Sequence, residues 1–169
     1  MFRQLFEAET RHTQRHAVPL EAVVTGVADD LRPLAEMKQL VITLKGGSAG
    51  SRVDIPSGAL RQSLWNVVQN CIELTARGAI EVEVSGIDVV ITDGSELSMD
   101  EIANIFDPFS FCQDPARTAK ISNLAVALAQ RLISAAGGTL MVCRAKESAG
   151  REFRIHLPAV STHPAGSAA

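Results

Sequence analysis

Apolar residues recur at helical spacing in three segments of the chain. The first segment begins at Pro19, and the second begins at Pro56–Ser57, where Ser57 is a plausible N-cap. The third covers residues 121–136 and ends at Gly137–Gly138, a pair suited to a left-handed C-terminal cap. The spacing of three and four residues predicts amphipathic helices. The apolar positions are Leu20, Val23, Val24, Val27, Leu31 and Leu34 in the first, and Leu60, Leu64, Val67, Val68, Cys71 and Ile72 in the second.

Strand-like patterns fill the segments between these helices. Residues 79–84 alternate apolar and acidic side chains, which is the period of a half-buried strand, and residues 89–92 return after a turn. Further strands are predicted at 40–44, 52–55, 139–144 and 151–157, and a short helix at 99–105. Because adjacent strands follow one another, we expect a mixed, mainly antiparallel sheet. About three helices on one face would make an α/β two-layer sandwich.

The chain of 169 residues divides into one globular domain and two flanks. Residues 1–18 are predicted to form the end of a preceding helix, because their apolar content is too small for independent folding. Residues 19–158 are predicted to form the domain. Residues 159–169 are small and polar, which predicts a disordered tail.

Composition excludes several function classes. A net charge of -3 gives no electrostatic basis for nucleic-acid binding. No apolar run approaches the roughly 20 residues that a membrane helix needs, so we expect no membrane contact. Cys71, Cys112 and Cys143 are widely spaced and form no metal-type pair, which favours buried thiols in a reducing compartment. We therefore expect a cytoplasmic domain.

Two asparagines stand four residues apart on the second predicted helix. This spacing places the amides of Asn66 and Asn70 on one helix face. An amide oxygen is a hard, neutral ligand that suits Mg²⁺ beside triphosphate oxygens. The alternative is a pair of surface or capping amides. Glu73 follows three residues later, and its carboxylate would repel a triphosphate.

Three further motifs follow in the second half of the chain. The strand end Val89–Thr92 runs into Asp93–Gly94, and Phe106 opens the stretch Phe106–Phe109. The third predicted helix starts with Ser122 and Asn123, and Lys120 precedes it. Taken alone, these segments are also typical of an Asp-Gly turn, two core aromatics and a plain buried helix start.

From Leu20 to Pro158, the order of elements and these motifs resemble the catalytic and ATP-binding domain of sensor histidine kinases. That domain has the Bergerat-type fold of gyrase-like ATPases. The resemblance implies that Asn70 is a Mg²⁺ ligand with Asn66 one helical turn back. Residues 1–16 resemble the end of the dimerisation helix in such kinases, which makes this helix a candidate homodimer contact.

The same resemblance implies an adenine-binding segment after residue 89. The family has Asp, any residue, Gly, any residue, Gly at this place. Counted back from Phe106, Thr92 takes the Asp position and Gly94 the first Gly, whereas a slip of one residue puts Asp93 in the Asp role. Phe106 corresponds to the aromatic residue at the root of the family's ATP lid.

The resemblance also implies a phosphate-binding helix start, with departures. The three glycine positions hold Ile121, Asn123 and Ala125, whose side chains block close approach of phosphates to the backbone amides. Ser122 is a candidate cap there, and Lys120 is a candidate partner for an anion.

Two functions follow from these motifs. In the first, the domain binds ATP and Mg²⁺ weakly and passes phosphate to a histidine of a separate dimerisation domain, in a system with a response regulator. In the second, nucleotide binding is lost and a pseudo-kinase module docks a response regulator or another partner. No catalytic residue is expected in this chain, because neither His12 nor His16 is followed by the acidic residue typical of a phosphoacceptor.

Overall fold

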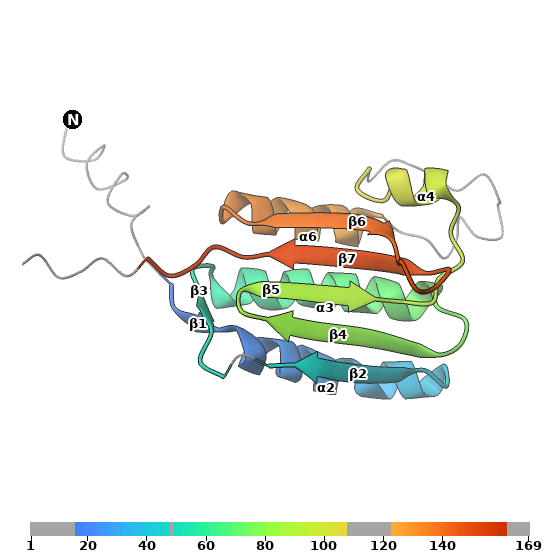
Figure 1. The fold of residues 1–169 in the computed structure, drawn as a ribbon, viewed down its shortest axis with the longest axis horizontal. Helices are drawn as coiled ribbons and strands as arrows, with labels where there is room; N and C mark the ends of the chain where they lie inside the picture. The colour runs from blue at the N-terminus through green and yellow to red at the C-terminus, as the bar shows by residue number, and fades with distance from the viewer. Residues whose placement is uncertain (1–15, 48, 108–122, 162–169) are drawn as a thin grey trace, which may run out of the picture.

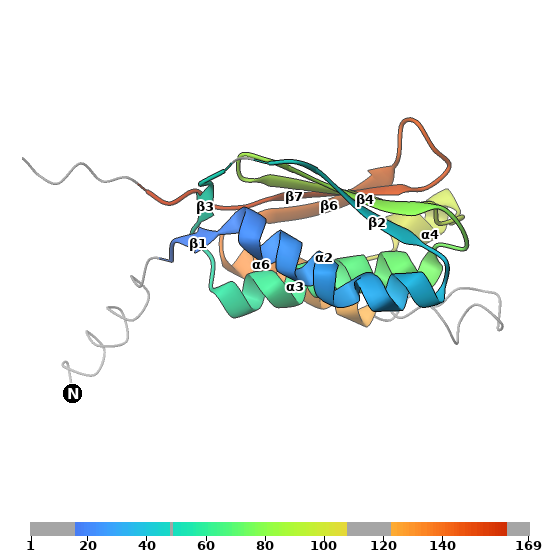
Figure 2. The same cartoon turned by 90° about the horizontal axis from the view of Figure 1, so that it is seen from below.

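The protein forms one five-stranded sheet with its helices on a single face. A computed structural model describes residues 16–47, 49–107 and 123–161. The strand order is β2-β4-β5-β7-β6 (Figure 1). Figure 2 shows α2, α3 and α6 in one layer on one side of the sheet. The α/β two-layer sandwich predicted from the sequence is therefore confirmed.

The central strands bring distant segments of the chain together. β2 (Val41–Gly46) runs parallel to β4 (Ala79–Ser85), and every other neighbouring pair is antiparallel. The remaining strands are β5 (Asp88–Thr92), β6 (Thr139–Arg144) and β7 (Arg151–His156). The sheet is thus mixed and mainly antiparallel, as the spacing of the strands predicts.

Three long helices supply the other half of the core. They are α2 (Leu20–Met37), α3 (Ser57–Leu74) and α6 (Leu124–Ala135), and the short α4 (Met99–Ala103) lies at one end of the sheet. α3 packs between α2 and α6. Alternate strand residues such as Ile80, Ile91 and Phe153 are buried against this layer. Among the described residues, no helix covers the opposite face of the sheet (Figure 2).

A second, two-stranded sheet lies at the end of the domain where residue 16 enters. β1 (Val18–Pro19) pairs with β3 (Arg52–Val53), and Val53 also bridges Ala159. The backbone N–H of His16 donates to Asp54 at 2.6 Å. The sequence patterns missed β1, because two residues show no periodicity. The predicted strand at 52–55 is shorter than expected and lies outside the main sheet.

The helix ends agree only partly with the sequence. Gly137 has φ 91° and follows α6 as a left-handed cap, as predicted. The prediction for Ser57 is wrong: Pro56 is the N-cap residue of α3, and no side chain caps this end. At α4, Ser98 and Glu101 form a reciprocal capping box.

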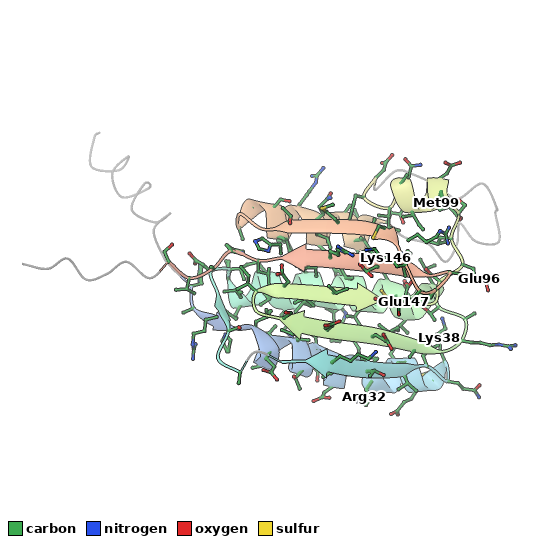
Figure 3. All side chains as sticks on the ribbon, viewed as in Figure 1. Arg32, Lys38, Glu96, Met99, Lys146 and Glu147 are labelled. Atoms are coloured by element: carbon green, nitrogen blue, oxygen red, sulfur yellow. The ribbon has the colours of Figure 1, made fainter. Side chains whose placement is uncertain are left out.

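Lys38 stabilises the C-terminal end of α3. Its Nζ donates to the carbonyl oxygens of Ile72, Glu73 and Thr75 at 2.6, 2.9 and 3.1 Å. Figure 3 shows Lys38 at the same end of the molecule as Glu96. Carbonyls in the last turn of a helix lack intrahelical donors, and a cation there also offsets the helix dipole. Lys38 thereby fixes the end of the helix that carries Asn70.

We predict that Lys38→Met lowers the free energy of unfolding by about 1–2 kcal/mol, because α3 loses the donor to its terminal carbonyls. Urea denaturation followed by circular dichroism measures this change. The control is Lys146→Met, in the exposed turn between β6 and β7, which should change stability by less than about 0.5 kcal/mol. Equal effects of both variants would contradict the capping role.

Candidate functional site

A fully buried ion pair lies between the sheet and α3. Arg151 is the first residue of β7, and Asp93 directly follows β5. Nε and Nη2 of Arg151 donate to Oδ2 of Asp93 at 3.2 and 2.6 Å, and both side chains are 0% exposed. A buried ion pair is tolerated when hydrogen bonds satisfy both partners. The neighbouring groups show how this pair meets that condition.

The guanidinium of Arg151 has two further partners. Nη1 donates to Oδ1 of Asn70 at 2.9 Å, and the guanidinium carbon lies 4.8 Å from the ring centre of Phe153. An aromatic face attracts a cation at this distance. The planar group is therefore bound along its edges by a carboxylate and an amide, and on one face by a ring.

The second oxygen of Asp93 is also fully used. Oδ1 accepts from the backbone N–H of Arg151 at 3.0 Å, from that of Ser95 at 3.2 Å and from the Ser95 hydroxyl at 2.8 Å. The backbone N–H of Asp93 donates to the carbonyl of Arg151 at 3.0 Å. Strand pairing thus fixes the carboxylate independently of the arginine side chain.

The structure separates the two candidates for the aspartate position. Side chains alternate along β5, so Ile91 and Asp93 point toward the helices and Thr92 points to the open face. On the open face, Thr92 pairs with Glu152 of the neighbouring strand β7 and lines a groove of about 650 Å³. The structure therefore brings Asp93, and not Thr92, to Asn70.

Gly150 permits the close approach of the β6–β7 hairpin to this site. A Cβ at Gly150 would lie 1.6 Å from the carbonyl oxygen of Asp93, which no side chain tolerates. Gly94, predicted to lie at an adenine, has less severe neighbours, the nearest being the Arg77 carbonyl at 3.3 Å from a built Cβ. No motif or period in the sequence indicates this role of Gly150.

A second arginine of the same hairpin holds the loop that follows Asp93. Arg144 is opposite Arg151 in the β6–β7 register. Its Nη2 donates to the carbonyl of Leu97 at 2.8 Å, and its Nη1 donates to that of Ala149 at 2.6 Å. The hairpin therefore contacts the loop 93–97 at both of its ends.

Asn66 joins two helices. Its Nδ2 donates to the carbonyl of Ala125 on α6 at 3.0 Å, and its Oδ1 accepts from Gln62 at 2.8 Å. These bonds occupy the amide in a structural role. Glu73 is exposed and accepts from Gln69 at 3.3 Å, so solvent screens its charge.

The predicted phosphate-binding residues are only partly described. Asn123 is 7% exposed and is the N-cap residue of α6, but its side chain makes no cap bond. Its Nδ2 donates to the Asn104 carbonyl at 3.4 Å, and its buried Oδ1 has no partner within the described part of the chain. Phe106 is half-buried and packs against the core. Lys120 and Ser122 lie outside the described residues.

The expectation of buried thiols is confirmed for Cys71 and wrong for Cys143. Cys71 is fully buried on α3, and burial, together with the charge of Asp93, raises the pKa of its thiol. Cys143 is exposed on β6, so the expectation was wrong there. Cys112 lies outside the described residues.

Comparison with protein families matches residues 56–161 to the histidine kinase-, DNA gyrase B-, and HSP90-like ATPases. The chain belongs to this family. A comparison with curated protein sequences found no match. Within residues 16–47, 49–107 and 123–161, no helix has the length and apolarity to cross a membrane.

Solved histidine kinases share this fold. Full-length ShkA in complex with AMPPNP has 25% identity and a TM-score of 0.72 over 89% of this chain and 32% of that one. The mycobacterial sensor histidine kinase MprB has 20% identity and a TM-score of 0.68, over 86% of this chain and 97% of that one. The cytoplasmic segment of the histidine kinase QseC has 13% identity and a TM-score of 0.66, over 87% of this chain and 80% of that one. The chain thus spans about a third of full-length ShkA and corresponds in fold to a histidine kinase ATP-binding domain.

The family resemblance implies a bound Mg-nucleotide, and two of the side chains that it assigns to this ligand, Asn70 and Asp93, are bound to Arg151 in this structure. Oδ1 of Asn70, the implied Mg²⁺ ligand, already accepts from a guanidinium, whose charge would repel a divalent cation. Both oxygens of Asp93 are committed to Arg151 and Ser95.

We predict that Asp93→Ala lowers the free energy of unfolding by about 3–5 kcal/mol, because the buried guanidinium of Arg151 loses its counter-charge. Chemical denaturation measures the change. The control is Asp88→Ala at the other end of β5, which removes an exposed pair with His156 and should cost less than about 1 kcal/mol. Similar losses in the two variants would contradict the special role of the buried pair.

Proposed function

We propose that this domain is a partner-binding member of the histidine kinase family that does not use Mg-ATP as a phosphoryl donor. The observation that supports the proposal is the guanidinium of Arg151, which binds Asp93 and Asn70 simultaneously. By resemblance, these two side chains would contact adenine and Mg²⁺. In this chain their oxygens already have an intramolecular partner.

The energetic cost of displacing Arg151 supports the same proposal. A nucleotide that took either oxygen would leave the arginine or the aspartate buried without its partner. Separating a buried pair in this way costs about 3–5 kcal/mol, which lowers affinity by roughly a hundredfold to a few thousandfold. Ala125 and Asn123, at positions where the family has glycine, add side chains at the start of α6.

The proposed partners are a dimerisation domain with a phosphoacceptor histidine and a response regulator. Family membership supports this partnership in general. A homodimer through residues 1–16 and a cytoplasmic location are parts of the same proposal. Within the described residues, the small sheet of β1 and β3 ties the point where residue 16 enters to the body of the domain.

The second candidate is the weakened phosphotransferase. The observation in its favour is that Asn66 and Asn70 occupy one face of α3, as a metal-binding pair requires, in a chain that resembles an AMPPNP-bound kinase in fold. Phosphoryl transfer would then depend on positioning and charge neutralisation of the nucleotide. This candidate requires Arg151 to leave Asn70 and Asp93.

Titration calorimetry with Mg-ATP separates the two candidates. We expect no saturable heat at millimolar nucleotide, while the catalytic domain of a kinase that binds ATP serves as a positive control in the same buffer. A Kd below about 1 mM for this chain would contradict the proposal. In parallel, radiolabelled ATP mixed with the chain and a dimerisation-domain fragment should leave the histidine unlabelled.

A further inference from the structure

We infer that the space between Asn70, Asp93 and Phe153 is a preformed site for a planar guanidinium-type cation, which the chain fills with its own Arg151. This inference rests on the proposed function, since it explains what occupies the site in place of a nucleotide. Arg151 is then a ligand surrogate built into β7.

The walls of the site match a guanidinium in shape. The carboxylate of Asp93 receives Nε and Nη2, the amide oxygen of Asn70 receives Nη1, and the ring of Phe153 covers one face. All three side chains are at most 3% exposed. A guanidinium is planar, with donors at fixed positions along its edges and a flat face that stacks on an aromatic ring. An ammonium group is a compact point charge whose donors rotate, so it does not match this arrangement of partners.

The walls do not depend on the arginine side chain for their positions. Asp93 is oriented by the hydroxyl and N–H of Ser95 and by the backbone N–H of residue 151, which every substitution except proline retains. Phe153 is fixed within β7 between two neighbouring strands. Shortening the side chain at position 151 therefore leaves a cavity with its hydrogen-bond acceptors in place.

The hairpin also stays in position without the Arg151 side chain. Gly150 packs against the backbone of Asp93, and Arg144 binds the carbonyl of Leu97. Neither contact uses the guanidinium of Arg151. The cavity in an alanine variant should therefore remain closed and selective, because the loop 93–97 cannot move away freely.

The experiment is chemical rescue of Arg151→Ala with methylguanidinium. At about 20 mM, we expect the cation to raise the Tm of this variant by roughly 2–5 °C, the size of a millimolar ligand effect on a domain of this length. Methylammonium at the same concentration should shift it by less than about 1 °C. The matched control is Arg154→Ala, which removes an exposed arginine of the same strand and should show no rescue.

An equal response of Arg151→Ala, Arg154→Ala and the unmodified chain to methylguanidinium would overturn the inference. If Arg151→Ala does not fold, the inference is tested by NMR of the unmodified chain, which measures the exchange of arginine Nε–H protons with water. The Arg151 Nε–H should exchange with water at least about a hundredfold more slowly than that of Arg154, because only buried, bonded protons are protected. Equal exchange rates of the two protons would overturn the inference.

Mg-ATP binding by the unmodified chain would instead contradict the proposed function and leave the rescue result intact.

Discussion

The buried ion pair between Asp93 and Arg151 is the interaction that links the elements of the site to one another. It joins the end of β5 to the start of β7, and through Asn70 it joins both strands to α3. A bare charge in this position would be strongly unfavourable, so the surrounding donors, acceptors and ring have to be in place. The pair is satisfied because strand register supplies the backbone N–H groups and because Gly150 allows the hairpin to approach.

Under the proposed function, this constraint explains how a catalytic-domain fold persists without nucleotide chemistry. The helices and sheet keep the architecture of histidine kinases, as the likeness to ShkA and MprB shows. Near Asn70, however, a cation supplied by the chain binds the two side chains that the resemblance assigns to a metal and a base. On this proposal, the domain completes its core with Arg151 and without a nucleotide.

Much of the fold was predictable, because long periodic segments report which face is buried. The three helices and the 79–92 hairpin follow directly from such periods. The N-cap residue of α3 was predicted wrongly and β1 was missed, because one capping residue or two paired residues produce no periodic pattern. The role of Arg151 was missed because its partners lie 58 and 81 residues away in sequence. One signal was present: Arg151 alternates with Phe153 and Ile155, which puts it on the buried face of β7.

If Asp93 and Arg151 stabilise the domain as a unit, a double-mutant cycle will show strong coupling between their side chains. Urea denaturation of Asp93→Asn, Arg151→Met and the double variant gives the coupling energy of the two side chains. We expect a coupling of about 3 kcal/mol or more, with the double variant more stable than the sum of the single losses implies. Additive losses, within about 0.5 kcal/mol, would contradict it.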